Sequence, residues 1–296
     1  MTVRLADLTD ADIAAERARL PAAFTTSFQD RVNFWFIWGG GTLLTVYCLY
    51  RFGFLSLDFL HGMGKFGSIV VAQLFPPTGW QDLPLFARAI GETIAMAFLG
   101  TLLGAVLAFP LSFLASKNMT RSRPLQFGTR RFADLLRSFD YLIWALIFVR
   151  AIGLGPLAGI MAIAIVETGT FIKLYSEAIE NLDRKQIDGV TAAGGNGLHR
   201  IRFGVLPQVL PMMLSNTLYM FEHNTRSAAI LGIVGAGGIG FLLADRIRAY
   251  ELQEACLIII LVVLTVYAID FLSKVLRERL IGDHERREPV DDAVQV

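Results

Sequence analysis

The stretch "LGIVGAGGIG" (Leu231–Gly240) decides the fold class, because its glycines admit two opposite interpretations. Gly235, Gly237 and Gly240 have the spacing of a dinucleotide-binding fingerprint, in which glycines let the backbone approach a pyrophosphate. One long apolar run and a charged tail come after the stretch, and no parallel sheet can be built from them. We therefore interpret the glycines as a hinge and a packing site between membrane helices.

The composition points to lipid as the solvent. The chain is 54% hydrophobic and only 18% charged, with a mean hydropathy of +0.52, whereas soluble domains average roughly 45–50% apolar and about 25% charged residues. The formal net charge of +1 gives no reason to expect nucleic acid as a partner. The four histidines have no metal-binding spacing, so no metal site is expected. The sequence predicts an all-α integral membrane protein.

A membrane-spanning helix needs about 20 apolar residues, and six segments qualify. Five are continuous runs: Phe34–Tyr50, Leu85–Ala115, Leu135–Ile152, Leu157–Tyr175 and Cys256–Leu272. The sixth, Leu206–Ala244, is interrupted, and as one helix it would be ~60 Å long, twice the hydrocarbon core. We expect a discontinuous span here, with a helix to about His223, a break, and a second piece through the glycines. Irregular backbone at membrane depth must be buried in protein or line a watery cavity, so the break is a candidate transport site.

Basic residues near span ends are retained in the cytoplasm and set the orientation. They concentrate after the second run, after the fourth run and at the C-terminal end, whereas the loop after the first run carries only Arg51 and Lys65. We therefore expect both termini in the cytoplasm. Residues 1–31 would be a cytoplasmic segment, 32–281 the transmembrane domain and 282–296 a disordered tail. A seventh span would place the basic tail outside, against this rule.

The segment "IDGVTAAGGNGLHRIRFGVLPQVLP" (Ile187–Pro211) is a cytoplasmic loop with an amphipathic pattern. Leu198, Ile201 and Val205 recur at helical spacing, and the glycines before them predict two short helical pieces. Pro207 marks the first turn of the next span, where its missing N–H does no harm. Such a hairpin suits docking against another protein, or it could lie in the lipid interface. These residues alone leave both possibilities open.

This loop resembles the EAA loop of ABC importer permeases, whose pattern is Glu-Ala-Ala, three residues, Gly, then Ile-x-Leu-Pro at a fixed distance. Gly194 falls on the family glycine and Leu206-Pro207 on the Leu-Pro pair. Asp188-Gly189-Val190 replaces Glu-Ala-Ala, and Gly204 occupies the isoleucine position. Further stretches are similar to the phosphonate permease subfamily in order and spacing: "IWALIFVRAIGLGPLAG", "KLYSEAIENLD", "VLPQVLP" and "RSAAILGIVGAGGIG".

The resemblance implies a non-catalytic permease subunit of the inner (cytoplasmic) membrane. It would pair with a second permease chain, identical or a sister subunit. It would also bind a cytoplasmic ATPase dimer and receive phosphonate, phosphite or phosphate from an extracytoplasmic binding protein. This chain has no P-loop motif, so ATP and Mg²⁺ would be bound by the ATPase partners and no cofactor is expected here. Within the coupling loop, about residues 183–205 with the adjoining proline, the expected contacts are Asp188, Gly189, Gly194, Gly197, His199, Arg200 and Pro207.

Ionisable residues inside the spans are functional candidates, because each costs about 2.5–3.5 kcal/mol at a helix centre. Arg226 would meet the anionic substrate, since a guanidinium binds two phosphonate oxygens. Glu222, one helical turn before it, would neutralise it, and the alternative is a pair that merely satisfies itself. Arg150 would attract the incoming anion or extend to the lipid interface. The other expected pathway and gate residues are Asn224, Glu167, Thr93, Gly235, Gly237 and Gly238.

Two other classes of protein remain as alternatives. An ion-coupled secondary transporter of an anion would also have broken helices and buried charges. It would not need the docking surface of the loop, and it usually shows an internal repeat that is not evident here. A membrane enzyme acting on lipid phosphate would need a metal or nucleophile constellation, which the sequence does not show.

Overall fold

The computed structural model describes residues 28–54, 57–120 and 122–285. Within these ranges every regular element is helical and no strand occurs. The chain divides into two compact units, Met1–Val71 and Ala72–Val296. The predicted all-α membrane fold is confirmed. The N-terminal residues 1–27, most of the predicted cytoplasmic segment, lie outside the described residues.

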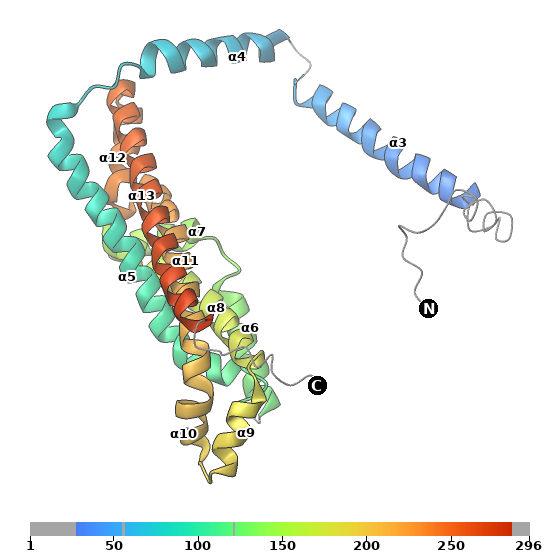
Figure 1. The fold of residues 1–296 in the computed structure, drawn as a ribbon. Helices are drawn as coiled ribbons and strands as arrows, with labels where there is room; N and C mark the ends of the chain where they lie inside the picture. Colours follow the sequence, from blue (N-terminus) through green and yellow to red (C-terminus); the bar gives the residue numbers. More distant parts are fainter. Residues whose placement is uncertain (1–27, 55–56, 121, 286–296) are drawn as a thin grey trace, which may run out of the picture. The chain divides into compact units, whose positions relative to one another are not determined.

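The first unit contains α3 (Phe28–Arg51) and α4 (Leu57–Ile69), and the π-helix η2 (Val70–Leu74) follows (Figure 1). Helix α3 contains the predicted run Phe34–Tyr50 and is long and apolar enough to cross a membrane. Its large side chains are exposed; Phe36, for example, is 82% exposed. A helix that is apolar all round requires lipid or another protein against it.

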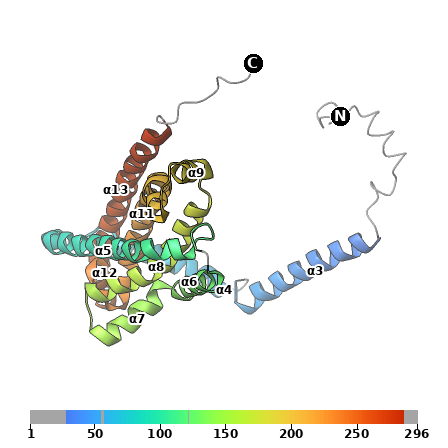
Figure 2. The ribbon, with the colours of Figure 1, turned by 90° about the horizontal axis from the view of Figure 1, so that it is seen from below.

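The second unit is a helical bundle around α8 (Pro156–Glu180). Before α8 come η3 (Trp80–Asp82), α5 (Leu83–Ala115), α6 (Arg123–Leu136) and α7 (Tyr141–Ile152). After it come α9 (Arg184–Ala192), α10 (Gly197–His199), η4 (Arg200–Val205), α11 (Leu206–Leu231), η5 (Gly232–Ala236), α12 (Gly238–Arg248) and α13 (Leu252–Glu285). Helix α8 packs against α5, α6, α7 and α11, and Figure 2 shows this bundle from below.

Small residues let α5 and α8 approach closely. A Cβ atom at Gly100 would lie 2.7 Å from Cβ of Ile163, and one at Gly104 would lie 2.7 Å from Cβ of Glu167. Both distances are shorter than real side chains tolerate, so only glycine permits this contact. Without a hydrophobic force between helices in lipid, such close packing is what holds them together.

The predicted number of spans is not confirmed. Among the described residues, four helices are long and apolar enough to cross a membrane, or five if one bent pair is counted as a span. The predicted run Leu135–Ile152 divides, because Asp140 caps α7 by accepting a hydrogen bond from Leu142 N at 3.0 Å. Helix α7 is 12 residues long, about 18 Å, which is shorter than a hydrocarbon core of ~30 Å.

The predicted break between two apolar helical pieces is present, but its predicted position was wrong. Helix α11 passes through His223 without interruption and continues as η5, and the bend of 57° to α12 follows. The break falls where Gly235, Gly237 and Gly238 have positive φ angles of 98°, 81° and 68°. Glycine adopts this conformation without steric cost, whereas the polar residues 222–226 lie within the continuous helix α11.

The C-terminal helix extends further than predicted. Helix α13 contains the run Cys256–Leu272 and continues to Glu285, so the first residues of the predicted disordered tail are helical. Residues 286–296, the rest of that tail, lie outside the described residues.

Candidate transport pathway and coupling hairpin

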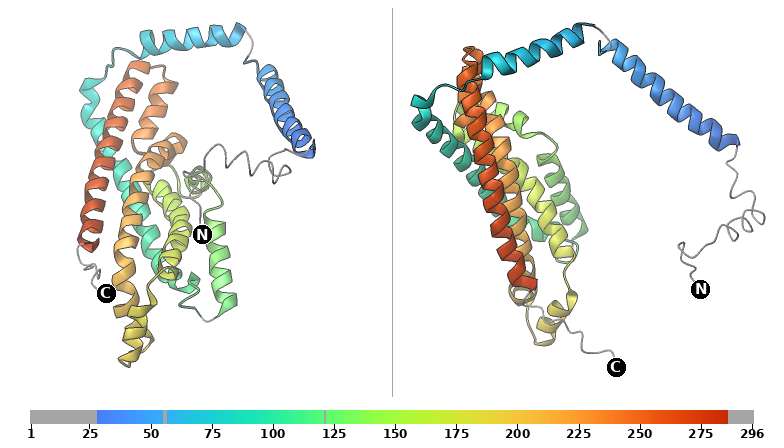
Figure 3. Two further views of the ribbon diagram at one scale, coloured as in Figure 1. Left: turned by 45° about the vertical axis from the view of Figure 1, so that its right-hand side comes forward. Right: turned by 45° about the horizontal axis from the view of Figure 1, so that its top comes forward.

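The loop after α8 forms a hairpin of two short helical pieces, as predicted. Asp183 caps α9 by accepting from Lys185 N at 3.0 Å. Asn196 caps α10 by accepting from His199 N at 3.0 Å, while His199 Nδ1 accepts from Asn196 N at 3.4 Å. Gly194 makes the turn between the pieces with a φ of 80°. Figure 3 shows the hairpin at the opposite end of the bundle from α12.

Glycines bring the two arms of the hairpin into contact. A Cβ atom at Gly204 would lie 3.2 Å from Ile187 Cα, and one at Gly195 would lie 2.7 Å from a methyl carbon of Val190. The close approach of Ile187 therefore gives a physical reason for glycine at position 204, where the EAA pattern has isoleucine. The arms pack so closely here that a larger side chain would separate them.

The predicted docking residues are all accessible: Asp188, Gly189, Gly194, Gly197, His199, Arg200 and Pro207 are exposed. Pro207 is the second residue of α11, as predicted, and η4 joins α10 to α11 without interruption. A cavity of about 790 Å³ lies beside the hairpin, and Lys117, Arg184 and Arg200 line it together with Asp188. The hairpin thus presents a largely cationic surface to a partner.

A largely buried polar cluster lies inside the bundle. Glu167 Oε1 accepts hydrogen bonds from Tyr141 OH at 2.7 Å and from Asn224 Nδ2 at 2.9 Å. Asn224 Nδ2 also donates to Thr101 Oγ1 at 2.9 Å. These four residues, here called the buried cluster, connect α5, α7, α8 and α11. Glu167 Oε2 and Asn224 Oδ1 have no hydrogen-bond partner among the described residues.

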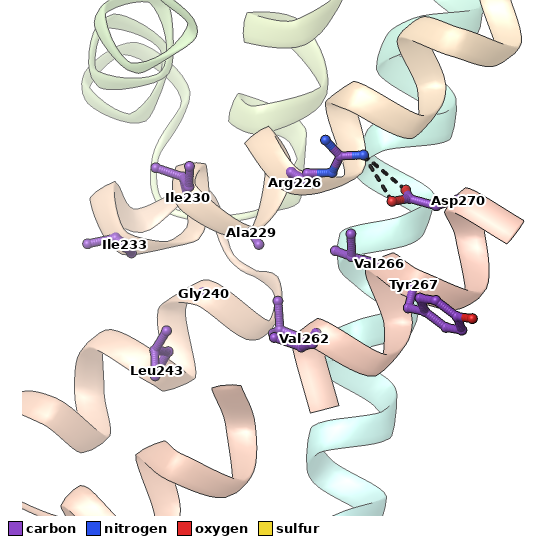
Figure 4. Close-up of a pocket in the computed structure, with 11 residues that line it drawn as sticks. Arg226, Ala229, Ile230, Ile233, Gly240, Leu243, Val262, Val266, Tyr267 and Asp270 are labelled. Carbon is purple, nitrogen blue, oxygen red and sulfur yellow. Dashed lines mark hydrogen bonds and ion pairs between the residues drawn. The ribbon is translucent and has the colours of Figure 1, made fainter. Parts of the chain in front are cut away.

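A second polar group joins α11 to α13 on the other side of α11. Arg226 Nη2 donates to Glu222 Oε1 at 3.0 Å and to both carboxylate oxygens of Asp270 at 3.1 Å. Arg277 Nη2 donates to Glu222 Oε2 at 2.7 Å. We call these four residues the charge ladder. The side chains of Arg226 and Asp270 are 48% and 38% exposed, and Figure 4 shows them facing each other.

The charge ladder borders a cavity of about 460 Å³ between α11, α12 and α13. Arg226 and Asp270 are the charged residues of its lining. The remaining walls are mainly aliphatic, with Ile230, Ile233 and Val262 among them (Figure 4). An anion in this cavity would therefore meet one cationic group, the guanidinium of Arg226.

The structure separates residues that the sequence grouped together. Arg226 and Glu222 pair as predicted, but Asn224 lies between them in sequence and faces the interior, where it contacts Glu167. Arg150 is exposed in the last turn of α7. Thr93 does not belong to the charge ladder. Its Oγ1 accepts a hydrogen bond from Ile239 N at 2.9 Å and so holds the start of α12.

The glycine break is held by the turn between α7 and α8. Gly155 N donates to Gly235 O at 3.1 Å. A Cβ atom at Gly237 would lie 3.0 Å from Cδ of Pro156, and one at Gly238 would lie 2.3 Å from Thr93 Oγ1. Gly235, Gly237 and Gly238 are therefore a tightly packed joint, away from the charge ladder.

Asp270, Arg277, Tyr141 and Thr101 were missed by the sequence analysis. Asp270 had a usable signal, because it is the single charged residue inside the apolar run Cys256–Leu272. A charge in such a run is a functional candidate by default. The hydroxyls of Tyr141 and Thr101 had no such signal, since both residue types are ordinary in membrane helices.

Comparisons with known proteins agree with this architecture. Residues 100–282 match the family model of the binding-protein-dependent transport system inner membrane component. The phosphite transport system permease protein PtxC of Stutzerimonas stutzeri is 36% identical over 222 residues, which cover 74% of this chain and 79% of that protein. An Escherichia coli K12 protein, named as a permease of a cryptic phosphonate transport system, is 46% identical over 121 residues, 41% of this chain and 99% of that protein.

The fold also matches a solved structure. A chain of the inward-facing MetNI methionine ABC transporter superposes with a TM-score of 0.60 at 21% sequence identity, covering 69% of this chain and 99% of that chain. This similarity concerns the fold alone.

Proposed function

Because the chain belongs to the family of binding-protein-dependent transport system inner membrane components, we propose that it is the permease subunit of an ATP-driven importer of a phosphorus oxyanion. Phosphonate, phosphite and phosphate are the candidates, and two relatives are named for phosphite and phosphonate. The chain is a multi-pass inner membrane protein. From its basic loops we infer that both termini are cytoplasmic.

One observation carries the proposed coupling mechanism: a single helix from Gly197 to Ala236 joins the hairpin to the glycine break. ATPase partners that bind ATP and Mg²⁺ would dock on the exposed hairpin. Their closure would move this helix as a rigid body and change the packing at Gly235–Gly238. The cations beside the hairpin, Lys117, Arg184 and Arg200, suit an acidic surface on the ATPase.

The charge ladder supports a pathway along α11 and α13. Arg226 and Asp270 lie within candidate membrane-spanning helices and are partly exposed. Charged groups exposed at membrane depth cost several kcal/mol against lipid, so this face belongs against water or protein. A second permease chain, identical or a sister subunit, would enclose the pathway here. A dianion crossing it would need the positive charge of Arg226 to offset its desolvation.

Substrate would arrive from the opposite side of the membrane from the hairpin. A binding protein would deliver it there, and Arg150, exposed at the end of α7, would attract it electrostatically. The chain itself would do no covalent chemistry.

The experiment is uptake of radiolabelled phosphite and methylphosphonate into proteoliposomes that contain the permease, its ATPase and its binding protein. We expect ATP-driven uptake by the wild type. Gly194→Val should reduce uptake by at least tenfold while ATP hydrolysis continues, because a β-branched residue is strained at the φ of 80° that Gly194 has. A tenfold fall in the uptake rate corresponds to a rise of about 1.4 kcal/mol in the activation free energy of transport.

Gly128→Val is the matched control, since a Cβ atom at Gly128 meets nothing within 4 Å and its φ is not positive. It should transport like the wild type. If neither oxyanion is taken up by the wild type, the proposed substrate class is wrong. If Gly194→Val transports normally in an assembled complex, the hairpin does not couple the ATPase to transport.

A further inference from the structure

The guanidinium of Arg226 is held by only one of its three nitrogens. The hydrogen bonds to Glu222 Oε1 and to both oxygens of Asp270 all leave from Nη2. Nε and Nη1 make no hydrogen bond with the described residues. In Figure 4 the dashed lines run from one nitrogen to Asp270, and the other terminal nitrogen points away from it. Since a guanidinium carries five N–H groups, those of Nη1 are available to a ligand.

The two acids of the charge ladder have different roles. Glu222 divides its oxygens between two cations, with Oε1 on Arg226 and Oε2 on Arg277. Both oxygens of Asp270 contact Arg226. Asp270 is therefore the group that chiefly neutralises Arg226, and the ladder as a whole carries no net charge.

This balance matters because the surroundings are apolar. The cavity beside Arg226 has mainly aliphatic walls, and in such a medium an unopposed guanidinium attracts a dianion strongly. Strong attraction fills the site and blocks release, whereas conduction requires binding that is favourable enough to enter and weak enough to leave. A neighbouring carboxylate lowers the attraction while leaving Nη1 of the guanidinium open to a ligand.

We infer that Asp270 is a positioning residue that sets how tightly the pathway holds an oxyanion. It engages Nη2 and orients the guanidinium, so that a substrate oxygen can bind the free N–H groups of Nη1 and depart again. Arg277 has the opposite effect on oxyanion affinity. It shares the carboxylate of Glu222 with Arg226 and so leaves Arg226 less fully neutralised. The inference rests on the proposed function and adds to it a means of tuning affinity.

The first test is equilibrium binding of radiolabelled phosphite to the purified permease–ATPase complex without its binding protein. Asp270→Asn keeps the shape and removes the charge, and it should tighten phosphite binding about three- to tenfold. Uptake into proteoliposomes at saturating binding protein should slow by a similar factor, because release becomes harder. Asp270→Glu should return both the phosphite affinity and the uptake rate toward those of the wild type.

The second variant should change phosphite affinity in the opposite direction. Arg277→Gln releases Glu222 to neutralise Arg226 more fully, so phosphite should bind about threefold more weakly. Glu177→Gln is the matched control, because Glu177 is an exposed acid of α8 whose partner Lys173 lies one turn away at 3.9 Å. It should change neither binding nor uptake.

A purely structural role for Asp270 predicts a different result. Binding, uptake and the amount of assembled complex would then fall together in Asp270→Asn. Binding no tighter than that of the wild type overturns the inference, and if this variant does not assemble, unchanged or tighter binding by Arg277→Gln overturns it. Failure of the wild type to transport either oxyanion would instead count against the proposed function.

Discussion

The two sides of α11 carry polar groups of opposite character. Asn224 is fully buried and joins the buried cluster, while Arg226, two residues later, belongs to the charge ladder and is 48% exposed. Two residues correspond to about 200° around a helix, which places the two side chains on nearly opposite faces. One helix therefore has an interior polar contact and an ionic contact at the same depth.

The difference teaches which group holds the fold and which is available for transport. A buried polar group that loses its partner costs about 1–3 kcal/mol, and the buried cluster joins four helices through the carboxyl group of Glu167 and the amide of Asn224. Partly exposed ion pairs contribute a median of about 0–1 kcal/mol. We expect the buried cluster to determine stability and the charge ladder to determine transport.

Replacing Glu167 tests the stability side of the comparison most severely. Glu167→Leu leaves the hydroxyl of Tyr141 without its acceptor and the amide of Asn224 with Thr101 alone, so the free energy of unfolding should fall by about 3 kcal/mol. Denaturant titration of the purified complex in detergent measures this loss. Glu177→Leu, on the exposed end of the same helix, should change stability by less than about 0.5 kcal/mol. Equal stability of the two variants would remove the buried cluster as the determinant of the fold.

Replacing Arg226 tests the transport side. Arg226→Gln removes the cation that meets the oxyanion, so phosphite uptake should fall at least tenfold, equivalent to about 1.4 kcal/mol, while basal ATP hydrolysis continues. Stability should fall by less than about 1 kcal/mol. Uptake in vesicles, read beside the amount of assembled permease, separates these effects.

Glu222→Gln is the companion variant, and it should change uptake less than Arg226→Gln because Asp270 still orients the guanidinium. If Arg226→Gln fails to assemble, or assembles and still transports well, the charge ladder is structural and the contrast between the two sides of α11 disappears.

The smallest expected effect comes from removing one hydroxyl. Tyr141→Phe deletes the hydrogen bond to Glu167 Oε1 and should lower the free energy of unfolding by about 1 kcal/mol, with uptake per assembled complex unchanged. The same denaturant titration measures it. A loss of uptake per assembled complex in this variant would show that the buried cluster takes part in transport. It would contradict the contrast between the two sides of α11.

Hydropathy and turn chemistry were enough to predict most of the helices. Apolar runs located α3, α5, α8 and α13, because membrane depth fixes the length of a span. The two-piece hairpin also followed from its glycine positions. Asp140 was the exception, since one capping side chain divided a run that hydropathy alone treated as continuous.

The polar contacts were harder to predict, because they depend on which face of a helix meets which neighbour. Glu222, Asn224 and Arg226 are close together in sequence, and their different partners follow only from the packing of α8 and α13 around α11. The contact of Asn224 with Glu167 spans 57 positions in the chain, so no local pattern reveals it. Asp270 could have been found from its isolation in an apolar run, and it was not.

The joint at Gly235–Gly238 divides one long span into arms of unequal length. The longer arm, Gly197–Ala236, measures about 60 Å, and the shorter arm, α12, measures about 17 Å. Pinned by Gly155 and Pro156, the two arms form a lever whose fulcrum lies close to the α12 end. A wide, gentle displacement of the hairpin would become a short, forceful displacement of α12, which gives the hairpin a mechanical advantage of roughly three- to fourfold over α12.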